Sequence, residues 1–208
     1  MKRFVFVLSF LAACLAIQAQ TAREVLDATA ARMTKSGAIR VQFKATQFRG
    51  TTPESEATGT MLIKGRKFQI NTPDVLTWFD GKTLWTMLTD AAEVNVSEPS
   101  DEELAAMNPS TLVYIYKKGY NYYLRKTSLR GKPTYEVRLA AKSKKATFTD
   151  IYIDVEQGTN NPLCIRAKQN GNWVRLSILS FKTEQNVQES DFTFPTQDYP
   201  KIEVIDLR

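Results

Sequence analysis

The chain has 208 residues, of which 28 are lysine or arginine and 22 are aspartate or glutamate, giving a formal net charge of +6. It contains no histidine. Neither a Ser-His-Asp nor a Cys-His arrangement can therefore form, and zinc would have to rely on carboxylates and a thiol. We predict that the protein is not an enzyme, has no catalytic residues, and needs no metal or cofactor.

Residues 1–19 have the pattern of a secretory signal peptide: a basic start, a short apolar run, and small residues before Ala19. Cleavage after Ala19 would leave 189 of the 208 residues, and we expect 20–208 to form a single domain. The alternative is lipoprotein cleavage at Cys14, because Leu11-Ala12-Ala13-Cys14 matches the pattern at which lipoproteins are acylated. We expect the protein in the periplasm, and this location excludes nucleic acid as a partner.

The first element expected after the signal peptide is an amphipathic helix over residues 21–36. Thr21 and Glu24 form a capping-box pattern, and apolar side chains recur at helical spacing until Gly37. From Ile39 the period changes to two, which predicts a strand with one solvated face.

Residues 59–88 have the pattern of four consecutive strands, the last two joined by Asp80-Gly81. Asp-Gly between alternating residues favours a two-residue type I′ turn, which would pair Phe79 with Lys82. One face of this hairpin then carries Leu76, Trp78, Thr83, Trp85 and Met87, and the other carries Val75, Thr77, Phe79, Lys82, Leu84 and Thr86. Both faces hold apolar side chains, so the sheet either lies between two layers or curls around hydrophobic material.

The strand pattern stops between Ser97 and Gly119. Ser100 and Glu103 repeat the capping box, and a further helix is predicted to begin at Asn108-Pro109. The apolar positions of these two short helices include Leu104, Met107 and Leu112. Their apolar stripe must be buried on another part of the molecule.

Strands resume after Gly119, and Asn170-Gly171 predicts a second type I′ hairpin that pairs Gln169 with Asn172. A last strand is expected over 201–207. Together the patterns predict a mainly β (α+β) fold with about ten or eleven antiparallel strands and three short helices. A sheet of that many strands curls, either over an ordinary core or around a lipid-sized space.

The order of an amphipathic helix, VQFKATQF, GTMLIKGRKFQI, FDGKTLW, an acidic helical insertion and SDFTFP resembles the LolA family of periplasmic outer-membrane lipoprotein carriers. The resemblance covers nearly all of the chain after residue 19. It implies an unclosed antiparallel β-barrel whose helical lid encloses acyl chains. The chain departs from the family at Gly65-Arg66-Lys67, where an arginine and a proline are usual, and at Ile70, where an aromatic residue is usual.

This resemblance also implies partners and site residues. The partners are acylated lipoproteins, bound by their lipid anchor, an inner-membrane lipoprotein-releasing ABC transporter and an outer-membrane acceptor, and the carrier is expected to be a monomer. Arg66 is expected to lock the lid, with an offset of one residue. The residues expected to bind ligand are Met33, Val41, Phe43, Met61, Ile70, Leu76, Trp78, Trp85, Leu104, Met107 and Leu112.

Two further hypotheses remain open. The same fold would serve a lipid-sensing regulator that signals through a protein partner. If Cys14 is acylated, the protein would instead be a membrane-tethered acceptor of lipoproteins.

Overall fold

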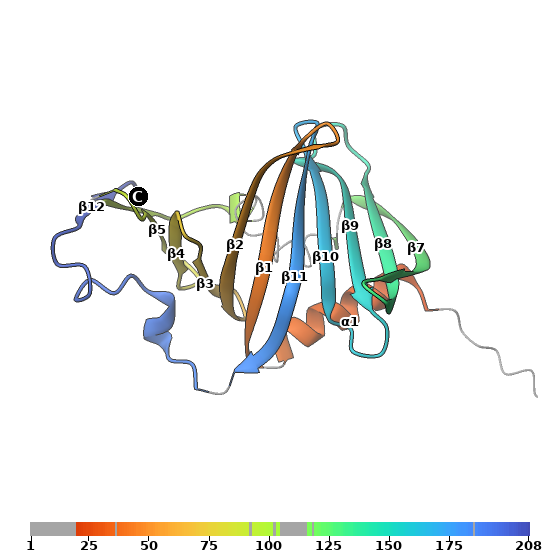
Figure 1. The fold of residues 1–208 in the computed structure, drawn as a ribbon, viewed down its shortest axis with the longest axis horizontal. Coiled ribbons are helices and arrows are strands. Elements are labelled where there is room, and N and C mark those ends of the chain that lie inside the picture. The colour runs from red at the N-terminus through yellow and green to blue at the C-terminus, as the bar shows by residue number, and fades with distance from the viewer. Residues whose placement is uncertain are drawn as a thin grey trace, which may run out of the picture.

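The computed structural model describes residues 20–35, 37–91, 93–101, 103–104, 116–117, 119–184 and 186–208. In this part of the chain, twelve strands form one sheet in the order β12-β6-β5-β4-β3-β2-β1-β11-β10-β9-β8-β7. The strands curve around one side of the sheet without closing (Figure 1). The predicted fold class is confirmed, with twelve strands in place of ten or eleven.

The elements are α1 (Ala22–Lys35), β1 (Ala38–Arg49), β2 (Thr52–Lys64), β3 (Lys67–Asn71), β4 (Val75–Phe79), β5 (Leu84–Leu88), β6 (Glu93–Ser97), β7 (Tyr120–Leu129), β8 (Lys132–Ala141), β9 (Phe148–Glu156), β10 (Pro162–Gln169), β11 (Asn172–Glu184), the 3-10 helix η2 (Glu189–Phe192) and β12 (Glu203–Asp206). The predicted last strand is present as β12, but it runs parallel to β6. The predicted signal peptide and the predicted helix from Asn108 lie outside the described residues.

The helix α1 begins at the predicted capping box. The Glu24 amide donates to Thr21 Oγ1 at 3.2 Å, and the Thr21 amide donates to Glu24 Oε2 at 2.7 Å. Its apolar stripe is buried against the sheet through Val25, Leu26 and Met33. The helix passes behind β9 and β10 in Figure 1, so it covers only one end of the inner face.

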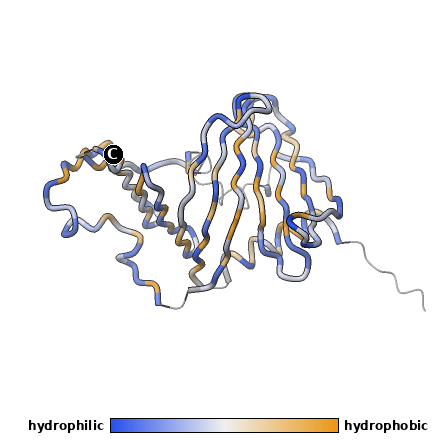
Figure 2. The backbone as a smooth tube through the Cα atoms, in the orientation of Figure 1, coloured by the Kyte–Doolittle hydropathy of each residue, from blue (hydrophilic) through white to orange (hydrophobic). Residues whose placement is uncertain are grey.

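Side chains alternate between the two faces along the strands. Figure 2 shows that hydrophobic and hydrophilic residues follow one another along these strands. Ile39, Val41 and Phe43 of β1 belong to the inner cluster, together with the buried residues of α1. Val41 pairs with Met61, and Ile39 pairs with Ile63 on β2, so the inner face continues across both strands.

The β4–β5 hairpin has a different register from the predicted one. Phe79 pairs with Leu84, not with Lys82, and the loop has four residues in place of two. The Asp80 carboxylate accepts hydrogen bonds from the amides of Lys82 and Thr83, both at 2.8 Å, which stabilises this longer loop. Because the shift is two residues, the two predicted faces are nevertheless correct.

The second hairpin is confirmed. Gln169 pairs with Asn172, and Asn170 and Gly171 have φ angles of 50° and 85°. Positive φ at both central positions is the requirement of a type I′ turn, and Asn-Gly meets it at little steric cost.

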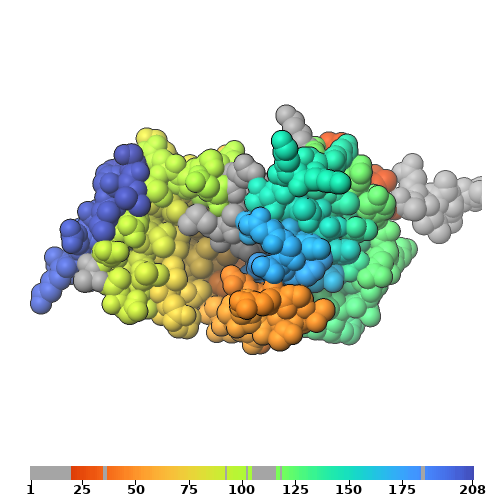
Figure 3. Space-filling model, turned by 90° about the horizontal axis from the view of Figure 1, so that it is seen from above, coloured from red at the N-terminus to blue at the C-terminus, as the bar shows by residue number. Residues whose placement is uncertain are grey.

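The outer face of β4, β5 and β6 is covered by the C-terminal segment, residues 187–202. Phe194 and Tyr199 lie against Trp78, with ring centroids 5.4 and 6.4 Å away. Glu189 forms ion pairs with Lys64 and Lys67 at the start of this segment. Seen from above, the last residues lie along the outer side of the strands drawn in yellow and green (Figure 3). Both apolar faces of this part of the sheet are therefore buried.

The outer face of β7 to β10 carries charged side chains. Glu136 is almost fully buried, and it accepts hydrogen bonds from Arg125 at 2.6 and 3.1 Å and from Arg166 at 2.6 Å. Burial alone would raise the pKa of Glu136, but these hydrogen bonds outweigh it and hold the pKa below the ordinary value of 4.5. Asp154 lies 3.4 Å from Arg166, and burial raises its pKa above the ordinary 3.8.

The two carboxylates should therefore respond oppositely to substitution. At pH 7, Glu136→Gln should lower the free energy of unfolding by about 2 kcal/mol, because it removes charge-assisted hydrogen bonds. Asp154→Asn should raise the free energy of unfolding, because it removes a buried charge whose ionisation opposes folding.

The pH dependence provides a control within the same pair. The contribution of Glu136 is present above its unfolded pKa and is lost as pH falls through its lower folded pKa, whereas the penalty from Asp154 disappears below its unfolded pKa. Urea unfolding at pH 7 and near pH 3 should show both effects at pH 7 and much smaller ones in acid. Equal destabilisation by the two substitutions at pH 7 would contradict the assignment.

Candidate functional site

The inner face of the half-barrel brings together six of the residues predicted to bind ligand. Met33, Val41, Phe43, Met61 and Leu104 are buried in one apolar cluster, and Ile70 packs at its edge. These residues come from α1, from the first three strands and from the helical residues 101, 103 and 104. The described residues therefore form a continuous apolar surface between the sheet and its helical cover.

The structure separates three other predicted residues from this surface. Trp78 is buried in a second cluster on the outer face, and Leu76 and Trp85 pack against that cluster. Placing these three with the inner-face residues was wrong, because the face that they share is covered by Phe194 and the C-terminal segment. Met107 and Leu112 lie outside the described residues.

The residues that continue the inner face on β3, β4 and β5 were missed. Phe68 pairs with Ile63, Phe79 pairs with Phe68, and Leu84 pairs with Phe79, so all three lie on the same face as Ile39. The rings of Phe68 and Phe79 are 5.2 Å apart. Tracing the register from β1 through β5 provides the signal that identifies the inner face, and alternation within one hairpin does not.

A cleft of about 590 Å³ opens at the edge of this surface. It is lined by Leu84, Thr86, Asn95, Ser97, Glu98, Pro99, Glu103, Leu207 and Arg208. Leu84 also belongs to the buried inner cluster, so the cleft borders the apolar surface directly. A polar opening beside an apolar interior suits a ligand that has a polar head and an apolar tail.

Two sets of contacts fix the ends of the segment between Ser100 and Tyr116. At its start, Arg66 Nη2 forms an ion pair with Asp101 Oδ1 at 2.5 Å, and the predicted capping box is present, with the Ser100 amide donating to Glu103 Oε2 at 2.8 Å. Its end is anchored by Tyr116, whose hydroxyl donates to Asp27 Oδ1 on α1. The Arg66 pair is exposed on both sides, whereas Tyr116 is 1% exposed.

The hydroxyl of Tyr116 stays protonated throughout the physiological range. Burial raises its pKa, and the hydrogen bond to the Asp27 carboxylate raises it further. A neutral hydroxyl is therefore always present to donate to Asp27. A second hydrogen bond anchors Tyr116, because the hydroxyl of Tyr122 donates to the backbone carbonyl of Tyr116.

These features define a half-barrel protein with an apolar inner face partly covered by helices. The family model described as outer membrane lipoprotein carrier protein LolA matches residues 12–172. The chain belongs to this family, as a divergent member. No curated protein matches the chain.

Several solved structures are similar to this chain at low sequence identity. A LolA superfamily protein from Nitrosomonas europaea is 13% identical, with a TM-score of 0.46 over 85% of this chain and 99% of that one. LprF from Mycobacterium bovis is 11% identical, with a TM-score of 0.49 over 80% of this chain and 95% of that one. The MucA/MucB complex of Pseudomonas aeruginosa contains a chain that is 12% identical, with a TM-score of 0.47 over 85% of this chain and 62% of that one.

In the described residues, no helix has both the length and the apolar character needed to cross a membrane.

Packing at the inner face predicts that Gly59, which lies within β2 opposite Phe43, does not tolerate a larger side chain. A Cβ atom there would lie 2.4 Å from the backbone oxygen of Asn71 and 3.0 Å from Cζ of Phe43. Gly59→Ala should therefore lower the free energy of unfolding by about 1 to 3 kcal/mol, because the β3 backbone has to move. The exposed neighbour Thr58 provides a matched control, and Thr58→Ala should change it by no more than about 0.5 kcal/mol. Urea midpoints of the two variants measure the difference, and equal values would contradict the crowding at Gly59.

Proposed function

We propose that the protein is a periplasmic carrier that binds the acyl anchor of lipoproteins on its inner face and carries it from the inner to the outer membrane. The observation that supports this most directly is the apolar inner face of a LolA family member, bordered by a cleft of about 590 Å³. Under this proposal the partners are acylated lipoproteins, an inner-membrane ABC transporter and an outer-membrane acceptor.

The energetics require that binding competes with internal packing. Burial of an acyl chain contributes about 0.8 kcal/mol per methylene, so complete burial of several chains would make release too slow for a carrier. In the structure, the inner face is already covered by Met33, Leu104 and Tyr116. An acyl chain therefore has to displace protein side chains, and the lost packing offsets part of the gain from burying the chain.

The segment between Ser100 and Tyr116 is proposed to act as the lid that exchanges places with the ligand. Its two anchors differ in strength. The exposed Arg66–Asp101 pair contributes no more than about 1 kcal/mol, because water screens the two charges. The hydrogen bond from Tyr116 to Asp27 contributes more, because its donor residue is almost fully buried and its acceptor is a charged carboxylate. We therefore propose Tyr116 as the main lock of the lid and Arg66 as a secondary one.

Weakening the main lock should make ligand binding tighter. Tyr116→Phe keeps the ring but removes the hydroxyl, which should lower the free energy of opening by about 1 kcal/mol and raise the apparent affinity for a fluorescent acyl probe about fivefold. Tyr123→Phe is the matched control, since Tyr123 is 54% exposed and its hydroxyl forms no hydrogen bond with the described residues. Probe titrations on both variants test this. Lower stability with unchanged affinity in Tyr116→Phe would show that Tyr116 belongs to a fixed core.

The cargo itself is tested by mass spectrometry of the protein extracted from the periplasm. We expect lipoprotein to be recovered with the wild type, and the amount recovered with Leu104→Glu to be at least fivefold lower. The new carboxylate can reach water only if the lid opens. Leu104→Glu should keep most of the stability, whereas Leu176→Glu, on the inner face of β11, should lose several kcal/mol because a buried charge there has no route to water.

Three outcomes would contradict this function. Recovery of phospholipid alone would favour a general lipid shuttle, and recovery of no lipid would leave the inner face as an ordinary core. An intact mass that shows acylation at Cys14 would identify a tethered acceptor in place of a carrier.

A further inference from the structure

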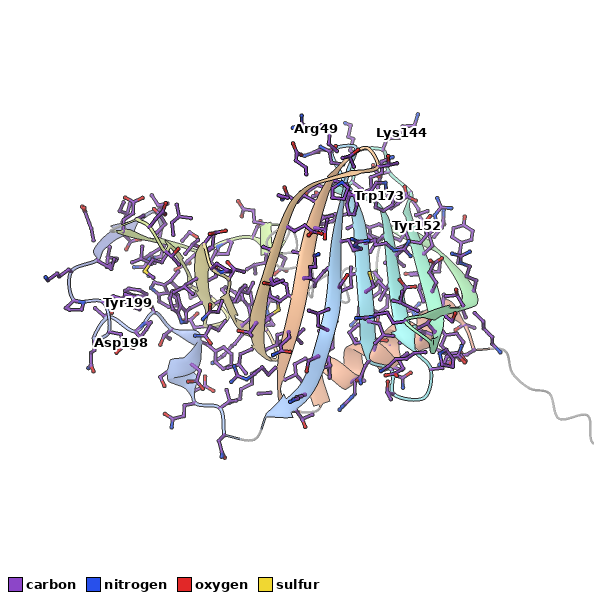
Figure 4. The ribbon with its side chains drawn as sticks, viewed as in Figure 1. Arg49, Lys144, Tyr152, Trp173, Asp198 and Tyr199 are labelled. Carbon is purple, nitrogen blue, oxygen red and sulfur yellow. The ribbon has the colours of Figure 1, made fainter. Side chains whose placement is uncertain are left out.

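A second pocket lies on the opposite face of the sheet from the inner cluster, at the end where the β1–β2 and β10–β11 turns meet. Its volume is about 240 Å³, and it is lined by Phe48, Gly50, Thr51, Arg166, Trp173, Val174 and Arg175. The register places Phe48 opposite Trp173, and Arg166 opposite Arg175, so the side chains of three adjacent strands converge there. The labelled Trp173 and Tyr152 lie on the face of the sheet turned toward the viewer in Figure 4.

Arg175 carries a positive charge that has no direct acidic partner within the described part of the chain. Its guanidinium lies over the ring of Phe48, 5.0 Å from the centroid, and its buried Nε has no hydrogen-bond partner. The carboxylate of Glu56 is close enough for the charge of Arg175 to lower its pKa, but its contacts go first to Lys44, at 2.7 Å, and to Thr46. The terminal nitrogens of Arg175 form no hydrogen bond or ion pair with the described residues, so these donors can serve a ligand in the pocket.

Arg166 contributes a second guanidinium to the pocket, and acidic side chains fix its position. Its Nη2 donates to Glu136 at 2.6 Å and to Asp154 at 3.4 Å, while its buried Nε is also unpartnered. The two carboxylates hold this guanidinium, and Tyr152 lies under it at 4.9 Å. A fixed guanidinium loses little side-chain entropy when it binds an anion.

The surroundings of the pocket are aromatic and basic. Trp173 lies 5.8 Å from Tyr152, and Lys168 Nζ lies 6.0 Å from the Trp173 ring. Beyond the pocket lie Arg49 at the end of β1, which forms an ion pair with Glu54, and Lys144 in the β8–β9 turn, both labelled at the top of Figure 4. Amphipathic aromatic rings beside arginine and lysine suit the boundary between a charged head group and apolar chains.

We propose that this pocket binds a phosphate group, supplied either by the head group of an anionic phospholipid or by a soluble phosphomonoester. Arginine presents a planar set of donors that matches phosphate oxygens in two-point contacts. The pocket is small enough to take a head group and too small for an acyl chain with its glycerol. It lies on the outer face, so the proposal does not depend on what the inner face binds.

The experiment compares the full-length exported protein with two variants of the same strand. Arg175→Gln removes the guanidinium in the pocket, and Lys182→Gln removes the same charge from an exposed position near the other end of β11. Binding is measured by co-sedimentation with phosphatidylglycerol vesicles and by titration with glycerol 3-phosphate. For each probe that the wild type binds, we expect Arg175→Gln to weaken binding at least fivefold. Lys182→Gln should change the affinity for the same probe less than twofold.

Binding to vesicles identifies the phospholipid as the source of the phosphate, and binding to glycerol 3-phosphate alone identifies a soluble phosphomonoester. Arg175→Lys keeps the positive charge but loses the planar guanidinium. This variant should bind the probe more weakly than the wild type while melting at the same temperature, which distinguishes a lost contact from a folding defect. Equal losses in Arg175→Gln and Lys182→Gln, no binding to either probe, or equally tight binding of poly-glutamate would overturn the proposal.

Discussion

Two adjacent side chains of β4, Trp78 and Phe79, point to opposite faces of the sheet, and both are almost fully buried, at 4% and 2% exposure. This two-sided burial is the constraint that organises the rest of the structure. An apolar strand cannot face water on either side, so the sheet needs one cover on the inner face and another on the outer face. The helices provide the first cover, and Phe194 and Tyr199 of the C-terminal segment provide the second.

The outer face of the other half of the sheet needs no cover, because its side chains are polar. On β7 to β10 the outer positions are charged or amphipathic, and Arg166 donates to Glu136 and lies over the ring of Tyr152 across the strands. A ladder of paired charges and rings needs no further layer, because water completes its solvation. The outer face therefore changes from a covered apolar surface on β4 to β6 into a solvated polar surface on β7 to β10. On the inner face, in contrast, both halves present apolar side chains to one cluster.

How far the sequence predicts this structure depends on how local the determining contact is. The capping box of Thr21 and Glu24 and the Asn170-Gly171 turn were correctly predicted, because each is decided by residues within one turn of chain. The register at Asp80 was wrong because its side chain accepts two amide hydrogen bonds, which favours a four-residue loop over the tight turn. The two faces of β4 were separated correctly, but nothing local says which is the inner one. That depends on pairing across four strands, from Ile39 on β1 through Ile63 and Phe68 to Phe79 on β4. The Asn170-Gly171 hairpin already places Arg166 opposite Arg175, but the outer pocket was missed because Phe48 joins them only through the pairing of β1 with the distant strand β11.

The inner surface is both a core and the proposed binding site, and this determines how a carrier of this kind would work. The same area of the inner face is removed from water whether Leu104 and Tyr116 or an acyl chain covers it, so displacing these side chains offsets part of the gain from burying the chain. Smaller terms that are present in only one state then adjust the balance. In the closed state these include the hydrogen bond from Tyr116 to Asp27 and the exposed Arg66–Asp101 pair. Because each contributes on the order of 1 kcal/mol, such contacts would shift loading by about a factor of five without changing the fold. A family member could thus adjust its affinity for cargo by altering these few polar contacts while its apolar inner face stays the same.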